Sequence, residues 1–439
     1  MLTAIERLAR CPRFGSGLGF VRCEALLDRL GLDPEGQRTI GITGSNGKGS
    51  TSAMTSALLT GVGLRVGLYT SPHFLDPCER FRIDGVSIQP EVFEELAAVV
   101  LDAAESIAGQ LGETFARFEL LTVMAWRLFQ RERVDIAVLE AGIGGRFDTT
   151  RLAKPTITAI TSLDLEHREL LGDSLELIFA DKLELTRAGG VCFASLPSDG
   201  HLRSRCRALA KLSTVQLNLL DEILPDLKYE ESPTGAWFTL DRSLAPIRLP
   251  VLGEWQGRNA ALAISIAREA VATPPDLVGW AERSLSVVTI PGRFETVQED
   301  PRIVVDAAHT PDAIQQVVAQ ILRRSAADLP LYPTPIVLVG ISANKPVEQM
   351  ATMIAKLRAP LFVAASSHGG AEPELLAAML RAGGAEIVAV SSDLGQTLSQ
   401  ARACAERLGG TLFVLGGLFF AADVCRLLRG ETPEGAIYL

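Results

Sequence analysis

The segment from Thr43 to Thr51 carries residues that could hold a polyphosphate. It reads Thr-Gly-Ser-Asn-Gly-Lys-Gly-Ser-Thr and follows the apolar run Ile40–Ile42. Glycines let the backbone turn tightly with its N–H groups facing inward, Lys48 adds a positive charge, and the hydroxyl of Ser50 can meet a metal ion. We therefore predict a phosphate-binding loop between a buried strand and a helix that begins at Ser50-Thr51.

The spelling of this loop departs from the usual Walker A sequence. Ile42 stands in the place of the first glycine, and Gly49 separates Lys48 from Ser50. An ordinary glycine-rich turn between a strand and a helix is the alternative interpretation. The apolar strand before the loop and the Ser-Thr pair after it favour nucleotide binding.

Polar side chains follow three further expected strands. The run Val134–Glu140 is apolar up to a single carboxylate, which is typical of a Walker B strand that places an acid beside the magnesium of a nucleotide. The strand Arg65–Thr70 is followed by Ser71, and the strand Thr156–Thr161 is followed by His167. Ligands of open parallel sheets bind at the carboxyl ends of the strands, so we expect these residues at one site, although His167 could be a simple surface histidine.

The bulk properties of the chain limit its class. Its 439 residues exceed the size at which a single core usually stops growing, so we expect two domains. The formal charge of −10 and the pI near 5.2 give no sign of a basic surface for nucleic acid. No apolar run is long enough to span a membrane and no signal-peptide pattern is present, so we expect a cytoplasmic protein. The seven cysteines are scattered without a C-x-x-C pair, and we expect them to be mostly reduced.

The predicted fold class is α/β, with two domains of different size. Residues 1–290 are expected to form a P-loop ATPase-like parallel-sheet domain with a short N-terminal helical segment. Residues 291–439 are expected to form a smaller, Rossmann-like α/β domain, because continuous apolar strands alternate with helices from Arg302 onward. We expect the segment Glu79–Arg82 to lie in a loop, and strand–helix alternation to continue to about residue 290.

Several motifs occur together in the order found in one protein family. They are Gly44–Ser50, Tyr69–His73, Glu79–Gly85, Phe118–Thr122, Leu139–Asp148, His167, Leu171–Asp173, Gln256 with Asn259, Pro291–Glu295 and Asp306–His309. Over nearly its whole length the chain resembles the folylpolyglutamate synthase/dihydrofolate synthase family, of the wider ATP-dependent Mur ligase group.

The resemblance implies an activity and its cofactors. It implies an ATP-dependent ligase that adds L-glutamate to a pteroate or folate carboxylate through an acyl phosphate, as dihydrofolate synthase, folylpolyglutamate synthase or both. The implied cofactors are ATP and one or two Mg²⁺ ions. The implied partners are the small molecules dihydropteroate or folate and L-glutamate, with no nucleic acid and no membrane, and the family is commonly monomeric.

The resemblance also implies roles for individual residues. The residues expected at ATP are Asn46, Gly47, Lys48, Gly49, Ser50, Asn259, Arg293 and Asp306. The residues expected at magnesium are Ser71, Glu140 and His167. The residues expected at the pteroate or folate are Phe118, Glu119, Phe147, Asp148 and Arg82. The residues expected to be catalytic are Lys48, Lys182 and His309, and the family carries a carbamylated lysine at the position of Lys182.

Departures from the family pattern leave the acceptor open. Asp164–His167 replaces the usual Gly-Leu-Asp-His, Thr310 replaces an asparagine, Leu183–Leu185 follows Lys182 where the family has Ala-Gly-Ile, and Asn344–Pro346 replaces Asp-Lys-Asp. One alternative is a Mur-type ligase with the same mechanism and another carboxylate acceptor. Such enzymes usually carry an additional N-terminal domain, whereas the phosphate loop comes early here.

A second alternative is a nucleotide-binding regulatory protein without ligase activity. The joint presence of Glu140, His167, Lys182 and Arg293 disfavours that alternative.

Overall fold

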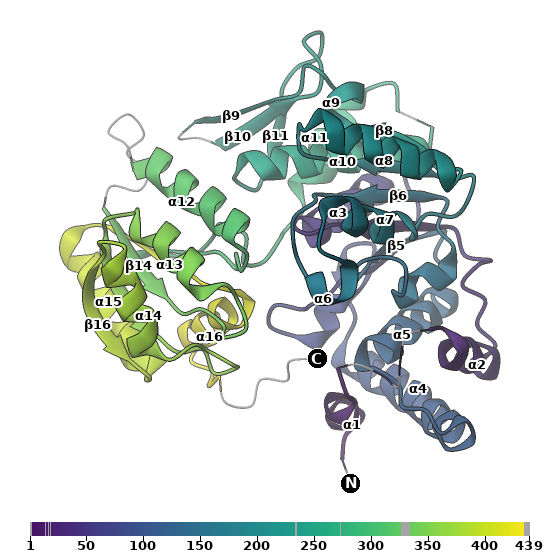
Figure 1. The fold of residues 1–439 in the computed structure, drawn as a ribbon, viewed down its shortest axis with the longest axis horizontal. Helices are drawn as coiled ribbons and strands as arrows, with labels where there is room; N and C mark the ends of the chain where they lie inside the picture. Colours follow the sequence, from purple (N-terminus) through teal and green to yellow (C-terminus); the bar gives the residue numbers. More distant parts are fainter. Residues whose placement is uncertain are drawn as a thin grey trace.

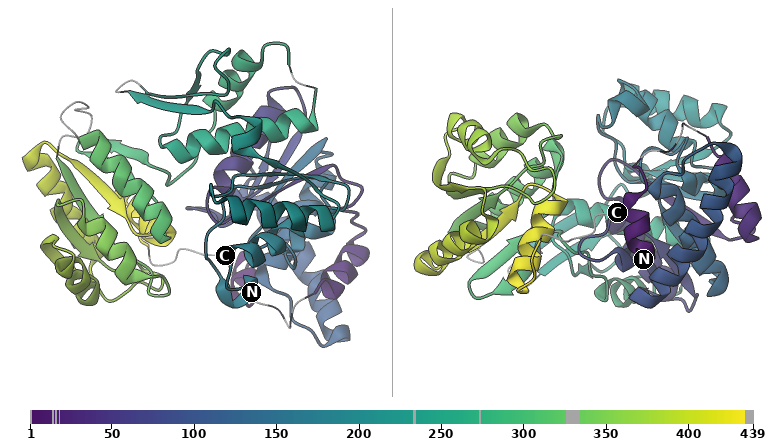
Figure 2. Two further views of the ribbon diagram at one scale, coloured as in Figure 1. Left: turned by 45° about the horizontal axis from the view of Figure 1, so that its top comes forward. Right: turned by 90° about the horizontal axis from the view of Figure 1, so that it is seen from below.

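The structure is a computed structural model that describes residues 2–13, 15, 17, 19–232, 235–272, 274–325 and 334–433. Within these residues, two α/β units are built on separate sheets (Figure 1). Two further directions of view show the same two bodies side by side (Figure 2). The α/β class predicted from the sequence is confirmed, whereas the boundary between residues 290 and 291 stays a prediction.

The first sheet has eight strands among the described residues, in the order β4-β3-β2-β5-β1-β6-β7-β8. The strands are β1 (Thr39–Thr43), β2 (Val66–Tyr69), β3 (Phe81–Ile83), β4 (Val86–Ser87), β5 (Ile136–Glu140), β6 (Ile157–Ile160), β7 (Val191–Ala194) and β8 (Gln216–Leu219). From β2 to β8 in this order the pairs are parallel, as predicted, but β3 and β4 add an antiparallel edge. Part of the expected loop at residues 79–82 is therefore strand β3.

Helices cover both faces of the first sheet. They are α1 (Ala4–Arg10), α2 (Val21–Leu30), α3 (Lys48–Thr60), α4 (Pro90–Leu111), α5 (Arg117–Arg131), α6 (Arg168–Leu171), α7 (Leu175–Leu183), α8 (Gly200–Leu212), α9 (Leu220–Ile223), α10 (Glu254–Ala270) and α11 (Leu277–Ser286), with the 3-10 helices η1 (Pro77–Arg80) and η2 (Thr149–Ala153). Ile136 and Val138 of β5 pack with α3 and α10, whereas Ala137 and Leu139 pack with α4 and α5. Burial on both faces requires an unbroken apolar strand, which is why β5 was predictable.

A small antiparallel sheet interrupts the expected strand–helix alternation before residue 290. It consists of β9 (Lys228–Ser232), β10 (Gly235–Thr239) and β11 (Ile247–Leu249), in the order β11-β10-β9. Its buried side chains, such as Phe238 and Ile247, pack in the same core as α10 and α11. The expectation of uninterrupted alternation was wrong here, because β9 is polar and has no apolar alternation to reveal it.

The second sheet has six strands in the described part of the chain, in the order β12-β13-β17-β14-β15-β16. The strands are β12 (Glu295–Glu299), β13 (Arg302–Val305), β14 (Pro335–Val339), β15 (Pro360–Ala364), β16 (Glu386–Ser391) and β17 (Thr411–Leu415); the helices are α12 (Pro311–Ser325), α13 (Val347–Ala355), α14 (Pro373–Ala382), α15 (Leu394–Leu408) and α16 (Leu418–Leu428). All pairs are parallel except β12 with β13. The parallel strands match the prediction, and the antiparallel edge strand β12 is an addition to it.

The segment after β2 ties the first unit to the second. The buried ring of Phe74 belongs to the same apolar core as α15 and α16. A Cβ on Gly292 would lie 2.8 Å from this ring, and Arg426 of α16 donates a hydrogen bond to the carbonyl oxygen of Leu75 at 2.5 Å. The loop that carries Ser71 is therefore held by the second unit.

Two further sequence-based expectations concern cysteines and membranes. All seven cysteines lie in the described residues and are free, and all but Cys11 are buried. Among the described helices, none combines the length and the apolar character needed to cross a membrane.

The close packing of β2 against α5 yields a stability prediction. A Cβ at Gly67 would lie 2.5 Å from the ring of Phe129, whereas a Cβ at Gly109 in α4 would meet nothing within 4 Å. Gly67→Ala should therefore lower the free energy of unfolding by about 1–3 kcal/mol, because the core must shift. Gly109→Ala, the matched control, should be neutral or stabilise by up to about 1 kcal/mol. Urea unfolding of both variants measures this, and equal effects would contradict the packing described.

Candidate active site

The phosphate loop connects β1 to α3, and the helix begins at Lys48 rather than at the predicted Ser50-Thr51. Gly47 has a φ of +88°, and its carbonyl oxygen accepts the first helical hydrogen bond from Thr51 N at 2.9 Å. The backbone N–H groups of Lys48, Gly49 and Ser50 thus belong to the first turn of a helix, where N–H groups lack intrahelical partners and attract anions. Lys48 Nζ donates hydrogen bonds to the carbonyl oxygens of Gly44 at 2.8 Å and of Ser45 at 3.2 Å.

The turn after β6 holds the phosphate loop in place. Ser162 Oγ accepts a hydrogen bond from Asn46 N at 2.8 Å, and Thr161 Oγ1 donates one to Asn46 O at 2.6 Å. Thr310 of the second unit donates to Asn46 Oδ1 at 3.4 Å. The buried Nδ2 of Asn46 finds no hydrogen-bond partner among the described residues. Asn46 therefore sits where both units meet, with a donor available for a ligand.

Glu140 brings a buried carboxylate to the loop. A Cβ on Gly49 would lie 3.4 Å from Glu140 Oε2, and Ser71 N donates a hydrogen bond to the same oxygen at 3.1 Å. Burial raises the pKa of Glu140 to about 7, against the lowering effects of the Lys48 charge and the Ser71 hydrogen bond. A carboxylate that is costly to ionise without a cation is a fitting ligand for one.

The three residues predicted at magnesium are only partly brought together. Ser71 and Glu140 are in contact, whereas His167 is exposed in the turn after β6, with a left-handed φ of +43°. Although the residue is largely exposed, partial desolvation of its ring lowers the pKa of His167, and the charges of Lys345 and Lys48 contribute to this shift. In the described residues, no group of three or more His, Cys, Asp and Glu side chains could hold a metal ion. A divalent cation at Glu140 would therefore take hydroxyl, phosphate or water oxygens as well.

Lys182 is fully buried on α7 and is paired with an acid. Its Nζ donates a hydrogen bond to Glu166 Oε1 at 3.0 Å, and 1% of its side chain is exposed. Burial lowers the pKa of Lys182, partly offset by Glu166. A lowered pKa favours the neutral amine that carbamylation requires, and the modification itself stays a prediction.

The loop after β5 is organised by two aspartates. Asp148 Oδ2 accepts a hydrogen bond from Gly142 N at 2.8 Å, and its Oδ1 accepts two from Thr150 at 3.0 and 2.6 Å. Asp181 Oδ1 accepts from Gly145 N at 2.9 Å. Burial raises the pKa of Asp148, against these hydrogen bonds. The carboxylate of Asp148 is thus engaged by the protein itself, and its predicted substrate role stays a prediction.

The other residues predicted at the pterin lie on two sides of this loop. A Cβ on Gly142 would lie 2.9 Å from the ring of Phe118, while Phe147 is 46% exposed. Glu119 is held by Arg22, whose Nε and Nη2 donate hydrogen bonds to it at 2.9 and 2.6 Å. The predicted role of Phe118 and Phe147 at the pterin stays a prediction, whereas Glu119 is used in an ion pair that no local sequence pattern disclosed.

Arg80, which was not predicted as a site residue, interacts electrostatically with Glu140, and the predicted role of Arg82 at the substrate stays a prediction. Arg80 is buried and its Nε donates to His73 Nδ1 at 3.0 Å. Burial lowers the pKa of Arg80, and Glu140 is among the acids that oppose this shift. Arg82 instead lines a cavity of about 260 Å³ between α3 and α11, together with Ser56 and Trp280.

The second unit adds residues at the carboxyl end of β13. Asp306 accepts hydrogen bonds from Phe294 N and Ala308 N, each at 2.8 Å, and is buried. His309 Nδ1 lies 3.2 Å from the carbonyl oxygen of Ala307. Burial lowers the pKa of His309 to about 4, and the charges of Lys345 and Arg293 add to the effect.

Positive groups of both units influence one another across the interface. The charge of Arg293 acts on Glu140, and Lys345 acts on His167 and is itself affected by Glu166 and Lys48. Lys345 was not predicted as a site residue, because the segment in which it lies departs from the family spelling. A polyanion would be attracted by the summed positive charge of Lys48, Arg293 and Lys345.

Asn259 on α10 completes the arrangement around the loop. A Cβ on Gly47 would lie 2.6 Å from Asn259 Oδ1, and Asn259 Nδ2 donates to Gln256 Oε1 at 3.1 Å. The structure therefore brings Asn46, Lys48, Ser71, Glu140 and Asn259 to the loop, as predicted.

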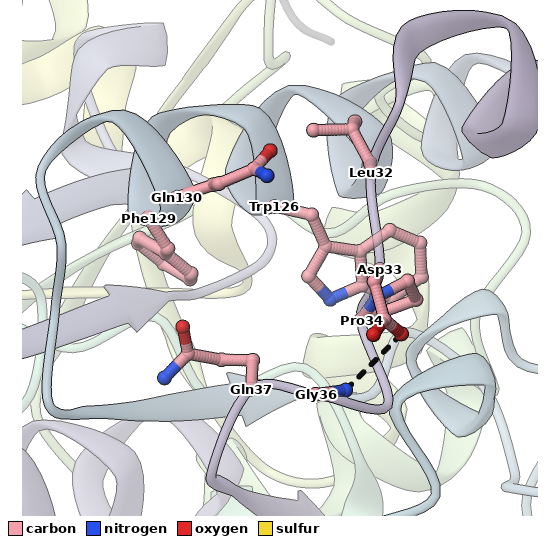
Figure 3. A pocket seen from close by; sticks show the side chains of 8 residues that line it. All are labelled: Leu32, Asp33, Pro34, Gly36, Gln37, Trp126, Phe129 and Gln130. Atoms are coloured by element: carbon pink, nitrogen blue, oxygen red, sulfur yellow. Dashed lines mark hydrogen bonds between the residues drawn. The ribbon is translucent and has the colours of Figure 1, made fainter.

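A separate cavity of about 270 Å³ lies at the amino end of β1, away from the phosphate loop (Figure 3). Leu32, Pro34, Gln37 and the aromatic residues of α5 line it. The buried Nε1 of Trp126 has no hydrogen-bond partner in the described part of the chain. None of the predicted site residues lines this cavity.

Comparisons with known proteins agree with the geometry. Residues 292–418 match the model of the family "Mur ligase, glutamate ligase domain". The chain is similar to the folylpolyglutamate synthase of Lacticaseibacillus casei, with 30% identity over 355 residues, which covers 77% of this chain and 79% of the relative. It is also similar to the solved structure of an FPGS–AMPPCP complex, with 26% identity, a TM-score of 0.81, and coverage of 97% of this chain and 99% of the other.

A longer relative matches almost the whole chain. The probable bifunctional folylpolyglutamate synthase/dihydropteroate synthase of Haloferax volcanii is 31% identical over 427 residues, which covers 96% of this chain and 49% of the relative. The chain thus spans about half the length of this relative and of a similar one from Halobacterium salinarum.

The shifted pKa of His309 predicts how stability depends on pH. Its pKa is about 4 in the folded protein against an ordinary value of 6.5, so protonation favours the unfolded chain. The stability linked to neutral His309 is fully present above about pH 6.5 and is lost as the pH falls toward 4. His309→Gln cannot titrate, so the wild type should lose about 2–3 kcal/mol relative to this variant between pH 7.5 and pH 4.5. Urea unfolding at several pH values measures the difference, and parallel curves for the two proteins would contradict the prediction.

Proposed function

Because this chain belongs to the folylpolyglutamate synthase/dihydrofolate synthase family, we propose that it is an ATP-dependent ligase that joins L-glutamate to a carboxylate of a pteroate or folate. The proposed products are the amide, ADP and phosphate. The match of residues 292–418 to a glutamate ligase domain supports glutamate as the amine substrate. The FPGS–AMPPCP complex, similar over nearly the whole chain, supports ATP as the second substrate.

The observation that carries this proposal is the pairing of the phosphate loop with Glu140. A helix N-terminus with Lys48 attracts phosphates, and a buried carboxylate stands beside the same helix turn. Ser71 and Glu140 would hold Mg²⁺, together with His167 if its ring turns inward. The ion would neutralise phosphate charge when bound.

The proposed chemistry has two displacements. A carboxylate oxygen of the acceptor attacks the γ-phosphorus, and the bond from this phosphorus to the oxygen that bridges it to the β-phosphate breaks. The products of this step are ADP and an acyl phosphate. The amino nitrogen of glutamate then attacks the acyl carbon, phosphate leaves, and the amine loses a proton. Both steps bring anions together, so Lys48, the N–H groups of α3 and Arg293 would serve by neutralising charge.

The remaining roles follow the predicted assignment and are part of the proposal. Asn259, Arg293 and Asp306 would position the nucleotide, and His309 would be a catalytic residue. Lys182, carbamylated, would face a second magnesium. Phe118 and Phe147 would border the pterin. We also propose a boundary near residue 290 between the two domains, a monomeric state and a cytoplasmic location.

We further propose that the second unit shields the acyl phosphate from water. The positive groups Lys48, Arg293 and Lys345, which would attract the phosphates, come from both units.

A substrate panel tests the proposed function. Phosphate release should require ATP, L-glutamate and one of dihydropteroate, tetrahydrofolate or a folate polyglutamate, and product mass should rise by one glutamate. The acceptor that gives turnover identifies the enzyme as a dihydrofolate synthase, a folylpolyglutamate synthase or both. If none of these acceptors gives phosphate release but a peptidoglycan precursor does, the Mur-type alternative is established instead.

Glu140→Ala separates a ligase from a protein that only binds nucleotide. Loss of this carboxylate should reduce turnover at least about 100-fold, because charge neutralisation in the transition state is lost. Binding of ADP should weaken far less. Asp102→Ala, an exposed acid paired with Arg7, is the matched control and should behave as the wild type. Unchanged turnover in Glu140→Ala would refute its role in the reaction.

A further inference from the structure

The carboxylate of Glu231 connects the two units of the molecule. Glu231 lies on β9, and 12% of its side chain is exposed. Its Oε1 accepts hydrogen bonds from Gly253 N at 3.0 Å and from the hydroxyl of Tyr229. Its Oε2 accepts a hydrogen bond from Gln320 Nε2 of α12 at 2.6 Å. One oxygen thus faces the first unit, and the other faces the second.

A buried arginine of α12 makes this contact depend on charge. Arg324 Nη2 lies 3.3 Å from Glu231 Oε2, with 4% of the arginine side chain exposed. Burial raises the pKa of Glu231, but the hydrogen bonds of Tyr229 and Gln320 and the charge of Arg324 outweigh this and hold the pKa below its ordinary value. Removing the negative charge would leave Arg324 buried without this counter-charge, which is costly.

On the side of the first unit, β9 fixes the start of α10. Gly253 precedes this helix, and its N–H is bound by Tyr229 Oη at 2.8 Å as well as by Glu231. A Cβ on Gly257 would lie 2.7 Å from the ring of Tyr229, so β9 and α10 are in tight contact. Two residues after Gly257 on α10 comes Asn259, which lies against Gly47 of the phosphate loop.

These contacts form one continuous path. It runs from Gln320 and Arg324 of α12, through Glu231, to the amino end of α10 and then to Asn259. In Figure 1, β9 and β10 extend from the first unit toward α12, which is consistent with the hydrogen bond between Gln320 and Glu231. A rotation of the second unit would move α12 and pull on this carboxylate.

We propose that Glu231 is a positioning residue for the nucleotide site, which links the placement of the second unit to Asn259 through the start of α10. The proposal rests on the proposed function in that Asn259 contacts the nucleotide. It identifies a determinant of nucleotide affinity that lies outside the phosphate loop and on a strand with no motif.

Nucleotide binding without any acceptor tests this directly. Isothermal titration of ADP and of AMPPNP with Mg²⁺ into the full chain gives the Kd of wild type and of Glu231→Gln, below the melting temperature of both. The variant keeps the size of the side chain but turns amide donors toward Gln320 and Arg324. We expect the Kd to rise about tenfold. Glu222→Gln, which removes an exposed acid paired with Arg207, is the matched control and should leave the Kd unchanged.

A double-mutant cycle distinguishes positioning from general stabilisation. If Glu231 acts through Asn259, then Glu231→Gln should raise the Kd by less than about twofold in an Asn259→Ala background. Gln320→Ala removes a contact on the α12 side only and should raise the Kd about threefold, and it carries the test if Glu231→Gln does not fold.

The outcomes separate this inference from the proposed function. No nucleotide binding by the wild type would overturn both. Binding by the wild type with an unchanged Kd in Glu231→Gln and Gln320→Ala would overturn the positioning role alone, even if the melting temperature falls. Independent effects of Glu231→Gln and Asn259→Ala, which multiply in the double variant, would overturn it as well.

Discussion

The site depends on the register of three neighbouring parallel strands, β5, β1 and β6. Ile42 lies opposite Glu140 on one side, and Thr43 lies opposite Ile160 on the other. Backbone hydrogen bonds fix this register, so the phosphate loop, the carboxylate and the turn at Thr161 leave the sheet at the same level. A slip of one residue would turn Glu140 to the opposite face of the sheet and separate it from the first turn of α3.

This geometry brings together buried ionisable groups whose charged forms are unfavourable in the absence of a ligand. Burial lowers the pKa of Lys182, Lys345 and His309, and raises that of Glu140. Each shift reflects the loss of water around a charge. A polyphosphate with its cation offers the opposite charge to both kinds of group, so the same burial that disfavours these charges in the free protein strengthens the attraction for such a ligand.

The sequence allowed the framework to be predicted but not all of its details. Strands such as β5 are buried on both faces and can therefore be recognised in the sequence as continuous apolar runs. The burial of Arg80 and its hydrogen bond to His73 could not be predicted, because they depend on how η1 and β3 pack beside β2. The pairing of Glu119 with Arg22 could not be predicted either. The two residues are far apart in the sequence and meet because α2 packs near α5.

The small sheet shows why a strand can escape prediction and still matter. In β9 the side chains of Tyr229 and Glu231 lie on the same face, since residues two apart in a strand point the same way. That face meets α10 and α12 with a hydroxyl and a carboxylate where a core strand would present apolar groups. Hydrophobic alternation is absent because the strand forms a polar junction between two units. A polar face with hydrogen bonds to both neighbours favours one orientation of them, whereas an apolar face would tolerate sliding.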